Sequence, residues 1–391
     1  MENFSYYSPT NYVFGKDTEK EVGILAKEAG ATKVLLHFGG GSAEKSGLLG
    51  RVRTSLKEEG IGFVELGGVC PNPRDDLVYE GISLCRKEGL DFILCVGGGS
   101  VIDSGKAIAV GVPYEGDFWD FYSGKAQVKT ALPVGVVLTI PAAGSEGSLS
   151  SVITKMDGLL KRDCSTPLIR PKFSILNPEL TYSLPDYQTA CGAVDIVAHV
   201  FERYITTTTG VDFTDRLCEA VLSTMVKNVP IVLKDPKNYD ARANIMWAST
   251  IAHNDTVGLG RTADWSSHLI EHELSALYDV AHGAGLAVIL PAFFRYQYKH
   301  DIPRFAQLAV RVFGVDMDFQ DPERTAVQGI DCLEAYFKSI GMPTTFDEIG
   351  AKEEDIPLLT EKCVMNNGDK MGYFNPITRE EIAKIYKLAC K

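Results

Sequence analysis

Hydrophobic positions change their spacing about half-way along the chain. In the first half, short apolar or β-branched runs at 33–38 (KVLLHF), 61–66, 92–96 (FILCV) and 134–140 alternate with segments of helical spacing. This alternation is typical of βαβ units and predicts a mostly parallel sheet. After about Pro185 the strand signals fade, and segments such as TACGAVDIVAHVFERYI and ERTAVQGIDCLEAYFKSIG carry apolar residues only at helical spacing.

The boundary between the two patterns is Leu184-Pro185-Asp186. Pro185 disfavours helix at the residue before it, and Asp186 can cap a helix that follows. We therefore expect an α/β domain over residues 1–185 and an all-helical domain over residues 186–391, which suits a chain of 391 residues.

Charge and cysteine usage exclude several classes of protein. The chain has 39 Lys and Arg against 51 Asp and Glu, whereas a nucleic-acid binder carries a basic footprint. Its nine cysteines include no C-x-x-C pair, which indicates reduced thiols in the cytoplasm. No stretch approaches the ~20 apolar residues that a membrane span needs. We expect a cytoplasmic protein that binds neither nucleic acid nor a membrane.

Two glycine runs each follow a predicted strand directly. Gly97-Gly98-Gly99-Ser100 lies between FILCV and the helical segment VIDSGKAIAV, and Gly39-Gly40-Gly41-Ser42 follows KVLLHF. Glycines at the carboxyl end of a parallel strand let a phosphate approach the N-terminus of the next helix. The alternative for Ser100 and Asp103 is a capping box without any ligand. Neither run has the G-x-G-x-x-G spacing, so the sheet is expected to be a non-standard Rossmann-like one.

Four of the seven histidines fall in helical segments of the second half. Asp195 and His199 are four residues apart, as are His268 and His272, and His282-Gly283 follows at a turn. A spacing of four places both side chains on one face of a helix, and imidazole with carboxylate suits Zn or Fe(II). His37, His253 and His300 are interpreted as structural or surface residues.

A different enzyme class is also compatible with one of these segments. His268-Leu-Ile-Glu271-His272 matches H-x-x-E-H, the inverted zinc-metallopeptidase motif, in which both histidines bind zinc and the glutamate activates water. This alternative leaves the glycine runs, Asp195 and His199 without a role. No feature favours a non-enzymatic metal-binding or nucleotide-binding regulator.

Taken together, these motifs resemble those of the iron-containing (group III) alcohol dehydrogenases. Within that family the chain is most similar to the NAD(P)H-dependent butanol dehydrogenases. The resemblance rests on GGGS, GGGSVIDSGKAIA and the Asp195/His199 and His268/His272/His282 sets, and it extends from YYSPTNYVFGKD through LNPELTYSLP to MGYFNPITREEIAKIYKLA.

The resemblance implies hydride transfer between NAD(P)H and a small primary alcohol or aldehyde, such as butanol or butyraldehyde, at a cleft between a dinucleotide-binding and a metal-binding domain. Another polyol or lyase member of the same superfamily is the alternative within the resemblance, and a homodimer is expected. The implied ligands of one Fe²⁺ or Zn²⁺ are Asp195, His199, His268 and His282, with His272 in substrate contact or proton relay. The implied cofactor residues are Gly39, Gly40, Ser42, Gly97, Gly98, Ser100, Asp103, Thr139, Ser145 and Lys161, the last in a loop before STPLIRPKFSILNPEL; the glycine-run argument adds Gly99.

The end of the predicted strand KVLLHF bears on the choice of dinucleotide. NAD-selective enzymes commonly place an acid there to bind the ribose 2′-hydroxyl. Here the strand ends in Gly39, while Ser42 and Lys45 offer a hydroxyl and a positive charge, partly offset by Glu44. We expect NADP(H) to be preferred over NAD(H).

Overall fold

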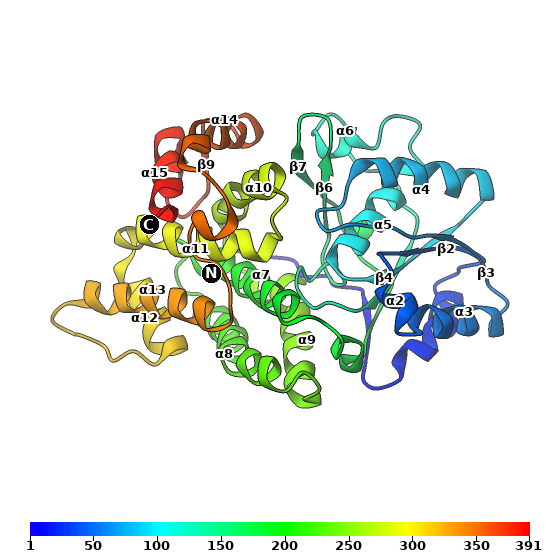
Figure 1. Cartoon of the computed structure of the whole chain (residues 1–391), viewed down its shortest axis with the longest axis horizontal. Coiled ribbons are helices and arrows are strands. Elements are labelled where there is room, and N and C mark those ends of the chain that lie inside the picture. Colours follow the sequence, from blue (N-terminus) through cyan, green and yellow to red (C-terminus); the bar gives the residue numbers. More distant parts are fainter. The chain divides into compact units, whose positions relative to one another are not determined.

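The chain forms two compact units in the computed structural model, which describes all residues 1–391 (Figure 1). One unit is Tyr7–Leu184, and the other combines Met1–Tyr6 with Pro185–Lys391. The placement of the first six residues corrects the expected 1–185 domain. The backbone N–H of Glu2 donates to Gly260 O at 2.8 Å, and the Glu2 carboxylate accepts hydrogen bonds from the side chains of Thr208 and Thr262, so this segment is anchored to the helical unit.

The unit Tyr7–Leu184 is built on a six-stranded sheet in which every pairing is parallel, as the alternating pattern predicts. The central strands β4 and β5 are buried at every residue, because helices cover both faces of such a sheet. In sheet order the strands are β1 (Asn11–Phe14), β8 (Phe173–Leu176), β5 (Val134–Leu138), β4 (Phe92–Gly97), β2 (Lys33–Phe38) and β3 (Gly62–Leu66).

Helices pack on this sheet through apolar stripes, and Figure 1 shows α3, α4 and α5 around β2, β3 and β4. One face carries a core of β-branched and leucine side chains shared by the sheet, α1 and α3. A hairpin of two half-polar strands, β6 (Ser150–Lys155) and β7 (Leu160–Ser165), was not expected from the sequence. The helices of this unit are α1 (Val22–Glu28), α2 (Ser42–Lys45), α3 (Leu48–Glu58), α4 (Asp75–Glu88), α5 (Gly99–Gly111) and α6 (Trp119–Tyr122), with 3₁₀ turns at Thr18–Glu21, Pro167–Ile169 and Pro178–Thr181.

The second unit is mostly helical, as expected, and α7 runs through its core in contact with α8, α9 and α11. It begins directly after Pro185, but no side chain caps it, so the expected Asp186 cap does not form. The expected all-helical domain needs one correction: residues 370–371 and 377–378 form a short antiparallel pair, β9 (Lys370–Met371) and β10 (Ile377–Thr378).

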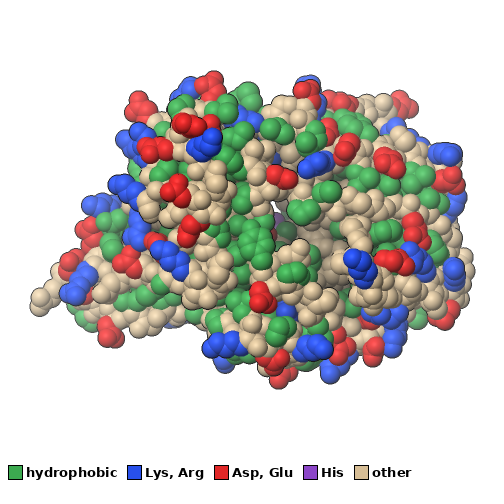
Figure 2. All heavy atoms as spheres, in the orientation of Figure 1, with side chains coloured by type: hydrophobic (Ala, Val, Ile, Leu, Met, Phe, Trp, Pro, Cys, Tyr) green, Lys and Arg blue, Asp and Glu red, His purple; other side chains and the backbone are tan.

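The helices of this unit are α7 (Asp186–Tyr204), α8 (Asp212–Lys234), α9 (Tyr239–His253), α10 (Ser266–Tyr278), α11 (His282–Gln297), α12 (Ile302–Phe313), α13 (Pro322–Ser339), α14 (Ile356–Asn367) and α15 (Arg379–Ala389). Short 3₁₀ turns lie at Thr256–Gly258, Tyr298–His300, Asp347–Ile349 and Glu353–Asp355. None of the helices has the length and apolar character that crossing a bilayer requires. On the face in view in Figure 2, acidic and basic side chains are interspersed.

Candidate metal centre and dinucleotide-binding turns

Helix α7 carries three polar side chains on one buried face. Asp195, His199 and Glu202 are spaced by four and three residues, which aligns them along the helix, and all three are buried. His199 Nδ1 lies 3.5 Å from Asp195 Oδ1. A buried carboxylate and imidazole at this spacing form the first half of a candidate metal centre.

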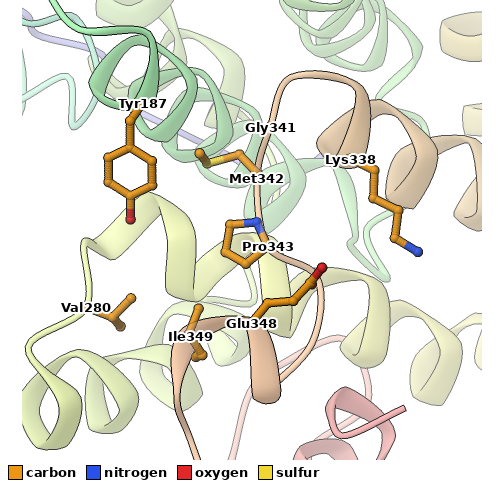
Figure 3. Close-up of a pocket in the computed structure, with 8 residues that line it drawn as sticks. All are labelled: Tyr187, Val280, Lys338, Gly341, Met342, Pro343, Glu348 and Ile349. Carbon is orange, nitrogen blue, oxygen red and sulfur yellow. The ribbon is translucent and has the colours of Figure 1, made fainter.

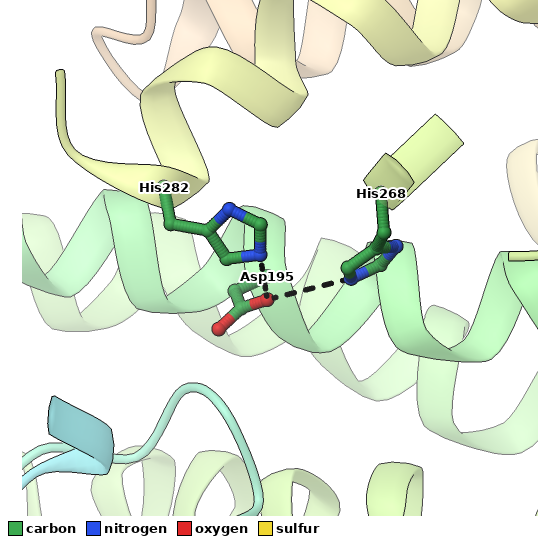
Figure 4. Close-up of side chains that lie close together, drawn as sticks. All are labelled: Asp195, His268 and His282. Atoms are coloured by element: carbon green, nitrogen blue, oxygen red, sulfur yellow. Dashed lines mark ion pairs between the residues drawn. The ribbon is translucent and has the colours of Figure 1, made fainter. Parts of the chain in front are cut away.

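Two further histidines reach the same carboxylate from α10 and α11. His268 Nε2 lies 3.9 Å and His282 Nε2 lies 3.7 Å from Asp195 Oδ1, and Figure 4 shows both rings turned toward that oxygen. The first turn of α11 comes this close because residue 283 is glycine: a Cβ there would lie 2.0 Å from the backbone oxygen of Cys191 on α7. The turn that the sequence indicated at His282-Gly283 therefore allows close helix packing beside the centre.

The polar atoms at this point have no protein partner. Asp195 Oδ1, His199 Nδ1 and His268 Nε2 are buried and accept or donate no hydrogen bond. Buried polar atoms are rarely left unpaired. Two ligands about 2.1 Å from one tetrahedral ion are about 3.4 Å apart, close to the separations seen around Asp195 Oδ1. One carboxylate with imidazoles suits Fe(II) or Zn, so the residues present fit a divalent metal.

His199 is the nearest of the three histidines to Asp195 Oδ1, at 3.5 Å, but it is not in the group whose ligand atoms all converge. Its ring lies 4.8 Å from the ring of His268, while the group whose ligand atoms converge is Asp195, His268 and His282. Burial and the neighbouring cationic groups hold the pKa of His199 well below its ordinary value. The imidazole is therefore neutral, which is the form that binds metals.

The glutamate of the H-x-x-E-H segment does not have the surroundings of a water-activating base. Glu271 is fully buried, and its carboxylate accepts hydrogen bonds from His282 Nδ1 and from Ser275 Oγ. His272 is half-buried, with its ring 5.6 Å from the ring of His282. It does not belong to the group around Asp195, although its nitrogen converges with Glu271 and His282. His272 therefore lies in a second group with Glu271 and His282, next to the group around Asp195 but outside it.

One histidine interpreted as structural or surface lies beside the centre. The ring of His253 stands 4.2 Å from the ring of His199, and Arg203 Nη2 lies 3.2 Å from its Nδ1. The guanidinium of Arg203 also stacks on Trp265 and donates to His199 O at 2.8 Å. These contacts are tertiary, and only Arg203, at four residues from His199, could have been placed by helical spacing. The other two fit a structural role: His37 is buried between Leu66 O and Ser104 Oγ, and the His300 ring packs on Phe374.

A separate surface hollow of about 650 Å³ opens on the helical unit. Figure 3 shows Tyr187 of α7, Val280 just before His282, and Met342 after α13 around it. None of the candidate metal ligands lines this hollow, so it does not form part of the centre described above.

In the unit Tyr7–Leu184, the glycines after β4 form the expected strand-to-helix turn. An added Cβ would lie 2.4 Å from Val101 Cγ2 at Gly97, 2.9 Å from Ile140 Cβ at Gly98 and 2.7 Å from Ala143 Cβ at Gly99. Close packing of the chain thus already requires glycine at all three positions. No side chain caps α5. The N–H groups of Val101 and Ile102 already donate to Gly98 O, so the N–H groups of Gly99 and Ser100 are the ones that a ligand could use.

The alternative capping box at Ser100 and Asp103 is wrong. The N-cap of α5 is Gly98, so Ser100 lies inside the helix. Asp103 instead accepts hydrogen bonds from Ser145 Oγ at 2.6 Å and from the Val152 backbone at 3.0 Å. Two expected cofactor residues, Asp103 and Ser145, are therefore in direct contact. Thr139 joins them at the turn, since its N–H donates to Gly97 O at 3.0 Å.

A buried lysine that the sequence reasoning missed holds this region together. Lys106 of α5 is fully buried, and its ammonium donates to the backbone oxygens of Ser145, Ser148 and Ser150 and to two of their hydroxyls. Burial lowers the pKa of Lys106 to about 8, although Asp103 and Glu146 counteract it. The sequence did hold a signal for this role: Lys106 lies three residues after Asp103, and that spacing places both side chains on one face of a helix.

The turn after β2 is more open. Nothing lies within 4 Å of a Cβ built on Gly40, and Ser42 and Lys45 are exposed. The Glu44 carboxylate is bound by Arg53 through two N–H groups at 3.0 and 2.8 Å, which lowers the pKa of Glu44. The expected position of Lys161 needs correction: it is in strand β7 rather than a loop, where it donates to Asn72 Oδ1 at 3.2 Å.

Comparison with known families decides what these features belong to. Residues 9–178 match the model of iron-containing alcohol dehydrogenases, and residues 189–390 match the model of the C-terminal domain of the same family. The chain belongs to the iron-containing alcohol dehydrogenase family. The resemblance seen in the sequence is confirmed, and nothing in the comparisons supports the metallopeptidase alternative.

Relatives within the family match over the full length. An NADH-dependent butanol dehydrogenase A of Clostridium acetobutylicum is 39% identical over 99% of each chain, and an NADPH-dependent aldehyde reductase of Escherichia coli is 35% identical over 100% of each. The crystal structure of an NADH-dependent butanol dehydrogenase A from Thermotoga maritima superposes with a TM-score of 0.97 at 39% identity, covering 100% of this chain and 99% of that one. Both dinucleotides are thus named among iron-containing alcohol dehydrogenases similar to this chain.

Proposed function

We propose that the protein is a metal-dependent alcohol dehydrogenase or aldehyde reductase that transfers hydride between NAD(P)H and small primary alcohols or aldehydes, such as butanol and butyraldehyde. The observation that carries this proposal is the group of unpartnered buried ligand atoms around Asp195 Oδ1, in a chain of the iron-containing alcohol dehydrogenase family. The names of the most similar relatives support butanol-like substrates.

In this proposal Asp195, His199, His268 and His282 hold one divalent metal. When bound there, Fe²⁺ or Zn²⁺ supplies Lewis-acid polarisation of the substrate oxygen. The neutral ring of His199 and the unpartnered Asp195 Oδ1 are ready to donate electron pairs without losing a hydrogen bond. Hydride chemistry needs no covalent nucleophile from the chain.

His272 is proposed to move the alcohol proton. Its ring is half-buried and 5.6 Å from the ring of His282, next to the group around Asp195 but outside it. An imidazole titrates near neutral pH, which suits it to accept the proton released on alcohol oxidation and to return one during aldehyde reduction.

The dinucleotide is proposed to bind along the two glycine turns. The uncapped N-terminus of α5 would receive the pyrophosphate, with Asp103, Thr139 and Ser145 held around it by the contacts described above. The open turn at Gly39 to Lys45 would receive the adenosine ribose, and Lys161 would contribute from β7.

The direct test of the activity is consumption of reduced nucleotide, followed by absorbance, over a panel of aldehydes of increasing chain length. We expect the metal-loaded protein to oxidise NADPH or NADH with butyraldehyde and to release butanol. A protein that cleaves peptides and consumes neither nucleotide would contradict the proposal.

We further propose that NADP(H) is preferred over NAD(H). The residue directly after β2 is Gly39 and carries no carboxylate. The Glu44 carboxylate is paired with Arg53, and Lys45 is exposed on the same short helix as Glu44. Wild-type kcat/KM should be higher with NADPH than with NADH. Gly39→Asp should shift that ratio toward NADH by roughly 1–3 kcal/mol, the scale of one charged hydrogen bond. The new Cβ would meet Val69 O at 3.5 Å and Val101 Cγ2 at 3.6 Å, which are ordinary contacts, so the variant should fold.

Steady-state kinetics with both dinucleotides test this preference. A wild-type enzyme more efficient with NADH, as the names of several relatives suggest for those proteins, would contradict it. If folded Gly39→Asp keeps the wild-type ratio of kcat/KM for NADPH to kcat/KM for NADH, other residues recognise the 2′ group of the ribose.

A further inference from the structure

Two buried carboxylates outside the ligand set contact the rings of two candidate ligands. Glu202 on α7 and Glu271 on α10 are 2% and 0% exposed. Glu202 Oε1 lies 2.7 Å from His268 Nδ1, and Glu271 Oε2 is hydrogen-bonded to His282 Nδ1. Each ring therefore lies between a glutamate on one side and Asp195 on the other.

These contacts decide which nitrogen of each ring is available to a metal. An ionised carboxylate can only accept a hydrogen bond, so the Nδ1 that faces it carries the proton. In a neutral ring the lone pair is then on Nε2, which in both rings is the atom that points toward Asp195 Oδ1. Burial opposes it, but the carboxylates of Asp195 and Glu202 raise the pKa of His268 to about 9, so a metal would displace a proton from this ring. The same arrangement serves both histidines, although they are on different helices.

Both glutamates are themselves fixed. Glu202 Oε1 also accepts from the backbone N–H of His268 at 3.0 Å and from Ser267 Oγ at 2.5 Å. Glu271 Oε1 accepts from Ser275 Oγ one helical turn away. Glu271 fits against α11 only because residue 285 is glycine, since a Cβ there would lie 2.3 Å from its Oε1. The helices around them thus accommodate both glutamate side chains and keep them buried.

We propose that Glu202 and Glu271 are positioning residues that fix the tautomer and orientation of His268 and His282 and thereby raise the affinity of the centre for a divalent cation. This inference rests on the proposed metal-binding function. It also gives a role to the glutamate of the H-x-x-E-H segment, which orients a ligand instead of activating water. With Asp195, the two carboxylates surround the site with three negative charges, which further favours a doubly charged ion.

The test is the affinity of metal-stripped protein for Co²⁺ and Zn²⁺, measured by competition with a chromophoric chelator. Glu202→Gln and Glu271→Gln keep the size of the side chain and remove the charge. Each should weaken both metals by about 10–100-fold, the usual effect of losing a carboxylate behind a histidine ligand. The absorption band of bound Co²⁺ should also change in both variants, because it reports ligand orientation.

Glu273→Gln is the matched control. Glu273 is a buried glutamate on the same helix as Glu271, and its Oε1 accepts a hydrogen bond from the Asn366 side chain. Its replacement should leave both metal affinities and the Co²⁺ band unchanged. Ser275→Ala removes the hydrogen bond from Ser275 Oγ to Glu271 and should weaken metal binding by a few fold. This variant replaces Glu271→Gln in the test if Glu271→Gln does not fold.

The outcomes separate this inference from the proposed function. Wild-type protein that binds neither Co²⁺ nor Zn²⁺ would overturn both. Wild-type protein that binds tightly, with folded Gln variants binding equally tightly, would overturn the positioning role alone. Equal losses in Glu273→Gln and Glu271→Gln would also overturn it, since the effect would then be one of general helix packing.

Discussion

Replacing His268 or His282 with alanine should remove the bound metal and the alcohol dehydrogenase activity together. Each ring faces Asp195 Oδ1 within 4 Å. Each alanine therefore removes one ligand of the metal ion that Asp195 and the two rings are proposed to share. Because Lewis-acid assistance is worth several kcal/mol, we expect turnover to fall at least about 10³-fold. Metal content per chain and steady-state kcat, measured on the same preparations, check this.

His272→Ala is the informative comparison for that result. Its ring is near the centre but outside the converging group, so the variant should keep its metal. Turnover should still fall, by roughly 10²-fold, because a proton-transfer group has been lost. If His272→Ala loses the metal while His199→Ala retains it, the peptidase-like ligand set is favoured and the assignment made here is wrong.

Gly40→Leu should raise the KM for the dinucleotide by roughly 10–100-fold, or ~1.4–2.8 kcal/mol, without reducing metal content. The expected cause is steric: the space around a Cβ at Gly40 is empty of protein, and the proposed cofactor would occupy it. This variant is a cleaner probe than Gly98→Val, because any side chain at Gly98 collides with Ile140 and disturbs the turn itself.

Gly50→Leu is the control for this prediction. Gly50 is exposed on α3 and also has no atom within 4 Å of its Cβ, but it lies outside the turn from Gly39 to Lys45 that is proposed to bind the ribose. Its substitution should leave KM unchanged and slightly stabilise the helix, since leucine has the higher helix propensity. An unchanged dinucleotide KM in folded Gly40→Leu would remove this turn from the binding site.

Most strands and helices could be predicted because each depends on the hydrophobic pattern of its own segment. The run FILCV is apolar at every position, which is typical of a strand buried on both faces, and it forms β4. The hairpin of β6 and β7 could not be predicted in this way, because Ser150, Lys161 and their neighbours mix polar and apolar residues. β6 packs on α5 and β7 contacts α6, and these contacts are tertiary.

The residues of the candidate site likewise fall into two classes: those that helical spacing predicts and those that only tertiary packing brings together. The spacing of Asp195 and His199 is a property of one helix, and it extends by three residues to Glu202, which the sequence analysis overlooked. The approach of His268 and His282 to that helix depends on tertiary packing, and only the family resemblance implied it. The pairing of Asp103 with Ser145 and of Glu44 with Arg53 likewise joins residues that no periodicity connects.

The most direct test of the account is metal content and aldehyde reduction followed in one preparation through removal and return of the metal. Purified protein should contain about one divalent ion per chain and reduce butyraldehyde with NADPH or NADH. Chelation should abolish reduction while the dinucleotide still binds, and stoichiometric Fe²⁺ or Zn²⁺ should restore it. Full activity in protein shown to hold no metal would contradict a metal-dependent reaction at Asp195 and the histidines around it.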